Sequence, residues 1–348
     1  MIVLNINLKY SIDLMNEILN IPSPGGDTSA CMERLKDEFH DLGIEVSETN
    51  KGAIFGTIRG EKELNQRLIS AHVDTLGAMV KEIKPNGRLR LSNIGGFSWN
   101  SVEGENVYIK TESGKVYTGT VLPEKASVHI YSDAVTTTER NEETIEVRVD
   151  EDIKESKDTK KLGIAVGDFV SFEPRNKITE SGYIKSRHLD DKACIAVLFA
   201  SCKHLKDNNL IPKYTTHFFI SNYEEIGHGL SGIPKKTNEI LALDIGTVGG
   251  KHTSDEKKVT IVAKDSRTPY DLKFRNRLVD LAQKNDIDYE VDVHYRYGSD
   301  ASLSVLQGVD ANFACIGMGV DATHHYERTH KKGIKNNIEL LISYLMEN

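Results

Sequence analysis

Lys185-Ser186-Arg187-His188-Leu189-Asp190-Asp191-Lys192 leads directly into the apolar segment Ala193 to Ala200. Two adjacent carboxylates therefore precede a run that is too apolar for a surface loop, and their removal from water must be compensated. A metal ion would compensate it. The alternative is helix capping, in which Asp190 or Asp191 accepts free backbone N–H groups at the start of the helix. Considered alone, the pair is more typical of a cap, so the rest of the chain decides between the two.

Histidines and carboxylates also follow other apolar segments. They are His72 at the end of 68–73, Glu224 and Glu225 after 218–220, Asp244 after 241–243, and His324 after 313–318. Such segments are typical of buried strands, and ligands of open α/β sheets gather at the carboxyl ends of the strands. Asp74 points to the same side as His72, because residues two apart in a strand share a face. We therefore expect these side chains to converge in one crevice, which Asp190 can join from its loop.

A cluster of this kind requires cations. Carboxylates that converge without a cation raise each other's pKa, and two divalent ions would remove the repulsion. The imidazoles and carboxylates together form a mixed nitrogen and oxygen ligand set, which suits Zn, Co or Mn. The set is too large for one tetrahedral ion, so the sequence predicts two divalent metal ions about 3.5 to 4 Å apart.

The periodicity of most of the chain predicts an α/β fold. Apolar residues at helical spacing predict helices, and short apolar segments predict strands. The expected helices cover 8–20, 27–42, 192–205, 271–285 and 338–346, and the expected strands cover 44–46, 53–58, 67–73, 215–221, 240–243, 289–294 and 313–318. Helices that alternate with apolar strands favour a mixed sheet with helices on both faces.

Between Met79 and Ser181 the sequence changes to short alternating runs separated by turns, such as Pro85-Asn86-Gly87. Strands at this spacing without long helices predict a small β-rich domain. The highly charged stretch 136–161 is interpreted as its exposed loop and a short helix. We therefore expect a discontinuous larger domain over 1–78 and 181–348, with a β-rich domain over 79–180 inserted into it.

Composition places the chain among ordinary globular proteins, with 348 residues of which 39% are hydrophobic and 28% charged. The net charge of -8 and the pI near 5.9 argue against binding to nucleic acid or to an anionic membrane. The scattered cysteines lie mostly in apolar surroundings, which predicts reduced, buried thiols and a cytoplasmic location. The short run Met1 to Leu4 lacks the features of a signal peptide, and no stretch is long enough to span a bilayer.

Five motifs, in this order, resemble the M42 family of di-metal aminopeptidases, which includes glutamyl aminopeptidases and tetrahedral aminopeptidases. The motifs are Ala71-His72-Val73-Asp74-Thr75-Leu76-Gly77, Leu189-Asp190-Asp191-Lys192, Tyr223-Glu224-Glu225-Ile226-Gly227, Ala242-Leu243-Asp244 and His324. The match extends from Ile18 to the C-terminus, and the number and order of the motifs make it specific.

This resemblance implies a role for each motif residue. The implied metal ligands are His72, Asp190 as the bridging ligand, Glu225, Asp244 and His324. Glu224 would be the catalytic base, and Asp74 would orient His72. The resemblance also implies that the larger domain is a metallopeptidase catalytic domain and that the inserted domain is barrel-like and serves oligomerisation or substrate access. Short peptides would be the substrates, and the protein would form a homo-oligomer between a dimer and a dodecamer.

Three neighbouring histidines, His324, His325 and His330, compete for the role of the last ligand. The position after the turn Gly317-Met318-Gly319 favours His324, and His325 comes next. His188 either lines the cleft or is a surface or capping residue. The sequence does not define the specificity for the N-terminal residue, and it assigns no role to Tyr326, Glu327 and Arg328.

The expected reaction is hydrolysis of an N-terminal peptide bond by water that the metals activate. Paired metals lower the pKa of water and polarise the scissile carbonyl, while Glu224 passes the proton of the water to the leaving amine. One alternative keeps the metals but cleaves N-acyl amino acids, as an amidohydrolase or deacylase. Another is a non-catalytic assembly protein on the same fold, and the presence of Glu224 beside a full set of ligands argues against it.

Overall fold

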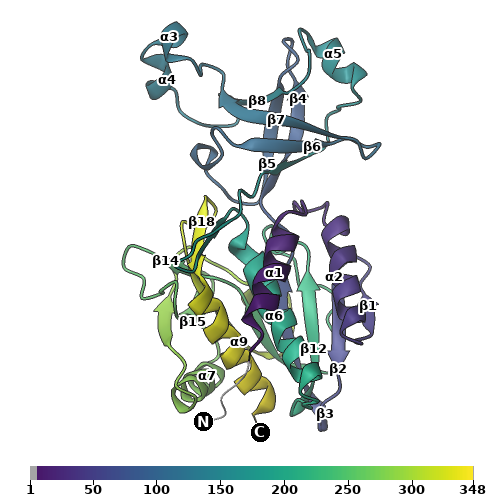
Figure 1. Cartoon of the computed structure of the whole chain (residues 1–348), viewed down its shortest axis with the longest axis vertical. Coiled ribbons are helices and arrows are strands. Elements are labelled where there is room, and N and C mark those ends of the chain that lie inside the picture. Colours follow the sequence, from purple (N-terminus) through teal and green to yellow (C-terminus); the bar gives the residue numbers. More distant parts are fainter. Residues whose placement is uncertain (1–5, 348) are drawn as a thin grey trace.

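The computed structural model describes residues 6–347, and the chain forms two parts (Figure 1). An α/β part carries both ends of the described chain, and a β-barrel lies at the opposite end of the molecule. The run Met1 to Leu4 lies outside the described residues. Within residues 6–347, no helix combines the length and the apolar character that crossing a membrane requires.

A large mixed sheet forms the centre of the α/β part. Its strands are β1 Val46–Glu48, β2 Ile54–Ile58, β3 Lys62–His72, β10 Lys177–Ile178, β11 Tyr183–Ser186, β12 Tyr214–Ser221, β13 Thr237–Leu243, β14 Gly246–Val248, β15 Val259–Lys264, β16 Tyr289–Val293, β17 Asn312–Asp321 and β18 Glu327–His330. The order along the sheet is β1-β2-β12-β3-β13-β17-β18-β11-β10. In its middle, β12, β3, β13 and β17 are neighbours and run parallel. Their carboxyl ends therefore lie side by side at one edge.

Helices cover the sheet, and one of them is almost entirely buried. The helices of this part are α1 Leu8–Leu19, α2 Ser29–Asp41, α6 Leu189–Asp207, α7 Leu272–Lys284, α8 Asp300–Leu306 and α9 Lys331–Met346. Helix α6 packs between α1, α9 and the sheet, and it is buried from Leu189 to Cys202 because its sequence is apolar on every side. This packing fixes the position of the start of α6, where Asp190 lies.

The inserted part is a closed antiparallel barrel with the strand order β4-β5-β8-β7-β6-β9. Its elements are β4 Gly77–Ile83, β5 Leu89–Ile94, η1 Trp99–Ser101, β6 Asn106–Lys110, β7 Val116–Pro123, α3 Val128–Tyr131, α4 Ala134–Thr137, β8 Ile145–Val149, α5 Ser156–Lys161 and β9 Phe169–Phe172. Alternate residues such as Val107 and Ile109 on β6 point inward and form its core. Because β3 leads directly into β4, the barrel stands next to the carboxyl end of β3.

The predicted fold class is confirmed, since a mixed sheet with helices carries an inserted barrel. The expected helices and strands occur near their predicted bounds, except that α9 begins at Lys331 rather than at residue 338. Strands β11, β14, β15 and β18 and helix α8 were not predicted. Strand β10 lies within the range expected for the inserted domain, but it pairs with β11 in the α/β sheet. Strand β18 consists of Glu327, Arg328, Thr329 and His330, so it has no apolar alternation to reveal it. Its pairing with β11 and β17 makes it a strand, and that pairing is not encoded locally.

All four cysteines are buried free thiols, as the sequence predicted. Burial raises the pKa of the Cys194 and Cys202 thiols well above the usual value. These thiols are therefore packing residues rather than nucleophiles.

Candidate metal centre and active site

The carboxyl ends of the parallel strands bring the predicted site residues together. His72 is the last residue of β3, Asp244 directly follows β13, and His324 follows β17. Glu224 and Glu225 lie on the turn after β12, which is paired in parallel with β3 up to the pair of Ser221 with His72. Neighbouring parallel strands thus supply side chains that are distant in sequence to one crevice.

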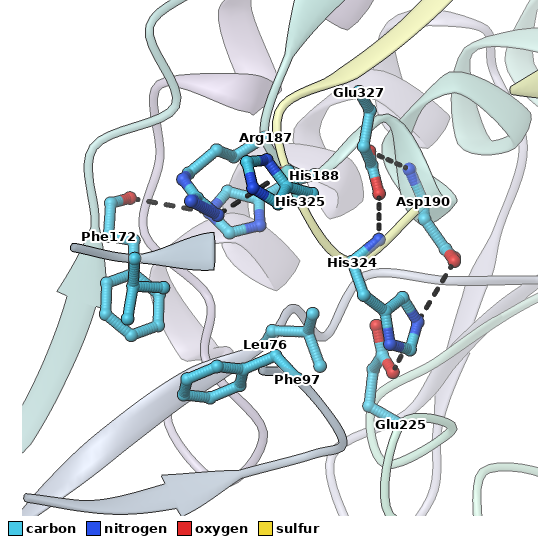
Figure 2. A pocket seen from close by; sticks show the side chains of 11 residues that line it. Leu76, Phe97, Phe172, Arg187, His188, Asp190, Glu225, His324, His325 and Glu327 are labelled. Carbon is cyan, nitrogen blue, oxygen red and sulfur yellow. Dashed lines mark hydrogen bonds and ion pairs between the residues drawn. The ribbon is translucent and has the colours of Figure 1, made fainter. Parts of the chain in front are cut away.

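Two groups of ligand atoms converge there, and one residue belongs to both. The first group is His72, Asp190 and Asp244, and the second is Asp190, Glu225 and His324, with the ligand atoms of each group within 4.8 Å of one another. The Nε2 atom of His72 lies 3.1 Å from Oδ1 of Asp190. The Nε2 atom of His324 lies 3.5 Å from Oδ2 of Asp190 and 3.6 Å from Oε2 of Glu225. Figure 2 shows Asp190 and Glu225 on either side of His324.

Both imidazoles are held with Nε2 towards the carboxylates. The Nδ1–H group of His72 donates to the carbonyl oxygen of Asp74 at 2.9 Å. The Nδ1–H group of His324 donates to the carbonyl oxygen of Gly96, in the barrel segment after β5, at 2.5 Å. A hydrogen bond of this kind fixes the tautomer and leaves Nε2 free to act as a ligand. The barrel thereby helps to position a candidate ligand.

The capping interpretation of the Asp190-Asp191 pair is wrong. The N-cap residue of α6 is His188, which makes no capping bond with its side chain, and both aspartates have non-helical backbone angles and are joined by a cis peptide bond. The carboxylate of Asp191 accepts the backbone N–H of His72 at 3.1 Å. Asp191 therefore ties the start of α6 to the end of β3, while Asp190 faces the crevice.

Glu224 stands beside the two ligand groups and belongs to neither. Its Oε2 atom lies 3.8 Å from Nε2 of His72, and its carboxyl is buried among other acids. Burial raises the pKa of Glu224 well above the usual value, and the charges of Asp244, Asp300 and Glu225 raise it further.

Asp74 organises the turn that carries the two glutamates. Its carboxylate oxygens accept the backbone N–H groups of Glu224 at 3.0 Å and of Glu225 at 3.1 Å. Its carboxylate lies farther from His72, with 3.6 Å between Oδ1 and Nδ1, and the closer contact to that ring comes from its main-chain carbonyl. Asp74 thus orients His72 mainly through its backbone and fixes Glu224 through its side chain.

Glu327 is a site residue without a predicted role. Its carboxylate accepts the backbone N–H of Asp190 and that of His324, both at 3.1 Å (Figure 2). Burial and the charge of Asp190 raise the pKa of Glu327 to about 8. Only the pairing of β18 with β11 brings this side chain to the start of α6, so no local signal could have identified it.

The other histidines considered in the sequence, His188, His325 and His330, lie around the centre rather than in it. Arg187 donates to the carbonyl of His325 at 3.2 Å, and His330 contacts the carbonyl of Ser181 through Nε2 at 3.0 Å. His188 is buried, and burial lowers its pKa to about 3. Of the three competing histidines, only His324 belongs to a ligand group within the described residues.

The electrostatics of the crevice fit cations. Burial raises the pKa of Glu225 to about 7, and burial together with the charges of Asp190 and Asp191 raises that of Asp244 well above the usual value. Burial alone would lower the pKa of His324, but Glu225 and Asp190 raise it to about 11. The buried Oε1 atom of Glu225 has no hydrogen-bond partner among the described residues. Divalent ions would accept such oxygens and remove the mutual repulsion.

A cavity of about 730 Å³ opens onto this centre. Its lining includes the acids Asp190, Glu224 and Glu225 and two arginines, Arg267 and Arg296. Within residues 6–347, neither arginine forms an ion pair with a carboxylate. A smaller pocket on the barrel side combines Phe97 and Phe172 with site residues, as Figure 2 shows.

The geometry defines a class of protein: two mixed nitrogen and oxygen ligand groups that share a carboxylate are typical of metal-dependent hydrolases. Comparison with known proteins agrees with this class. The sequence profile described as M42 glutamyl aminopeptidase matches residues 52–340. The chain belongs to this M42 family of metallo-aminopeptidases, which hydrolyse peptide bonds.

Individual relatives cover nearly the whole chain. The protein YhfE of Bacillus subtilis (strain 168) is 46% identical over 340 residues, which are 97% of this chain and 98% of that protein. A TET aminopeptidase from the marine sediment archaeon Thaumarchaeota archaeon SCGC AB-539-E09 has a TM-score of 0.87 at 17% identity and covers 97% of both chains. The TET1 peptidase of Pyrococcus horikoshii, which can assemble into a tetrahedron or a large octahedral shell, has a TM-score of 0.83 at 19% identity. That alignment covers 97% of this chain and 100% of the other.

Proposed function

We propose that this aminopeptidase uses two divalent metal ions, Zn, Co or Mn, held by the two ligand groups. His72, Asp190 and Asp244 would hold one ion, and Asp190, Glu225 and His324 the other. The observation that carries the proposal is the shared carboxylate of Asp190 between two imidazoles whose Nε2 atoms both face it. When bound, such ions act as Lewis acids towards water and towards a carbonyl oxygen.

Glu224 is the general base in this proposal. Its carboxylate lies beside His72 but outside the ligand groups, so it is free to exchange a proton. A carboxylate in this position can take a proton from water and pass it to the leaving amine. Asp74 positions Glu224 by accepting its backbone N–H.

A pair of neighbouring substitutions tests these roles. Glu224→Gln should keep the metal content and lower kcat by about 10²- to 10⁴-fold, because it removes only the proton transfer. Glu225→Gln should lose metal as well as activity. Metal per subunit and hydrolysis of an aminoacyl-p-nitroanilide would be measured for both. A Glu224→Gln enzyme with wild-type turnover would show that the assigned base is wrong.

The same assay separates peptidase from amidohydrolase activity. Hydrolysis of free aminoacyl-p-nitroanilides but not of their N-acetylated forms is expected from an aminopeptidase. Chelation followed by restoration of Zn²⁺, Co²⁺ or Mn²⁺ would identify the metal that supports the reaction.

We also propose that the chain forms a homo-oligomer through its barrel. Val128 and Ile130 on α3 are 60% and 73% exposed, and exposed apolar side chains close together favour association. The structurally similar TET1 peptidase of Pyrococcus horikoshii can assemble into a tetrahedron or a large octahedral shell. In this proposal the barrel also serves substrate access, because Phe97 and Phe172 of the barrel line the smaller pocket beside the centre.

A further inference from the structure

A second group of metal-ligand side chains lies outside the centre described above. It consists of His252, in the segment after β14, Asp292, on β16, and His294, just after β16. One ligand atom from each of them lies within 4.8 Å of the other two. We propose that these three residues bind an additional divalent cation of the zinc type.

The ligand types select the class of ion. Two imidazoles and one carboxylate are the three protein ligands of many zinc sites, whereas Mg²⁺ and Ca²⁺ prefer oxygen ligands. Asp292 and His294 are 5% and 1% exposed, while His252 is only half-buried. Two ligands are therefore fixed inside the protein, and the third leaves an open side for water.

The carboxylate is held in place by its own neighbours. Oδ2 of Asp292 accepts the hydroxyl of Ser254 at 2.6 Å and the backbone N–H groups of Thr253 and Ser254 at 3.0 Å. Oδ1 of Asp292 faces Nδ1 of His252 at 3.3 Å. Outer hydrogen bonds of this kind orient metal ligands.

His294 supplies an independent observation. Its Nδ1 atom is engaged with the hydroxyl of Thr247 at 2.6 Å, but its buried Nε2 atom has no hydrogen-bond partner in the described part of the chain. An unpaired buried nitrogen is costly. A simple ion pair between Asp292 and His252 would leave this nitrogen unsatisfied.

A cation at this position would stabilise part of the cavity above the candidate active site. The ring of His294 packs on Tyr297, with 4.8 Å between ring centroids, and both Thr247 and Tyr297 line the cavity above the candidate active site. A cation would tie the segment after β14 to the segment after β16 and so hold this wall of the cavity.

The experiment measures zinc per subunit in the full-length protein after chelation, equilibration with Zn²⁺ and desalting. His252→Asn should bind one ion fewer than the wild type, and His129→Asn, which changes an exposed histidine of the barrel, should bind as many as the wild type. Equal zinc content in the wild type and His252→Asn would overturn the proposal.

A variant of the candidate active site separates this test from the metal ions proposed there. Asp190→Asn removes the shared ligand of the centre, and this variant should still retain one zinc ion per subunit. Co²⁺ in its place should give visible d–d absorption that disappears in Asp190→Asn/His252→Asn. An Asp190→Asn protein that binds no metal would overturn the additional site, whereas loss of metal only from the centre would leave it intact.

Discussion

At the scale of single residues, the centre depends on hydrogen bonds that aim the candidate ligands as much as on the ligands themselves. Gly96 and Asp74 fix the rings of His324 and His72 through their carbonyl groups. Glu327 holds the backbones of two candidate ligands at once. Such outer partners commonly change metal affinity by about 10- to 100-fold when they are removed.

Glu327→Gln is expected to weaken metal binding by about 10- to 100-fold, because an amide offers one acceptor oxygen for two N–H groups. Metal affinity from a competition titration with a chelating dye would measure the effect. Glu256→Gln provides the control, since the partly buried Glu256 pairs with Arg328, the neighbour of Glu327 on β18, but touches no candidate ligand. Equal affinities in the two variants would contradict the role given to Glu327.

Acid should destabilise the protein partly through His217. Burial lowers the pKa of this residue, whose ring lies 2.9 Å from both Thr57 and Gln66. The unfolded chain therefore binds a proton that the folded protein excludes. The contribution of His217 to the free energy of unfolding is fully present above the unfolded-state pKa of about 6.5. It decreases as the pH drops below that value, by at most about 1.4 kcal/mol per pH unit. Thermal unfolding of His217→Gln should depend less on pH between 7.5 and 5 than that of the wild type. His129→Asn should behave like the wild type.

At the scale of elements, parallel strands decide what the site contains. β12, β3, β13 and β17 end at one edge, and each delivers a candidate group there. The buried helix α6 brings Asp190 to the same place. The segment between β16 and α8 adds Arg296 and Tyr297 to the cavity wall.

The two arginines that line that cavity, Arg267 and Arg296, predict a preference for acidic N-terminal residues. Arg296→Gln should lower kcat/KM for glutamyl-p-nitroanilide by about 10- to 100-fold, the loss expected for a charge-assisted hydrogen bond. The same substitution should lower kcat/KM for leucyl-p-nitroanilide much less. Arg148→Gln, an exposed change on β8 of the barrel, is the matched control. A parallel loss on both substrates would contradict a specificity role for Arg296.

At the scale of the whole molecule, the barrel contributes residues to the candidate site and also carries the surface proposed for assembly. It supplies Gly96 to His324 and contributes Phe97 and Phe172 to the pocket beside Asp190 (Figure 2). Its far surface carries the exposed apolar residues of α3. The proposed assembly would thereby be linked to the candidate site through one inserted domain.

Ile130→Glu is expected to reduce the oligomer to smaller species, because it places a charge in the proposed contact. Light scattering coupled to size exclusion would report the mass. Leu272→Glu, at a 58% exposed position on α7, should leave the mass unchanged. A wild-type chain that is monomeric at micromolar concentration would disprove the proposed assembly.

The sequence by itself determined the α/β pattern, the presence of a β-rich insertion and the residues that end the central strands. These features are local or periodic, so hydrophobic spacing and motif order suffice to predict them. Only the tertiary structure decided that Asp190 faces the crevice rather than capping α6, and that Glu327 and Gly96 support the candidate ligands. The same holds for the convergence of His252, Asp292 and His294. Each of these relations joins residues far apart in the chain through strand pairing or packing, and neither propensity nor spacing encodes such contacts.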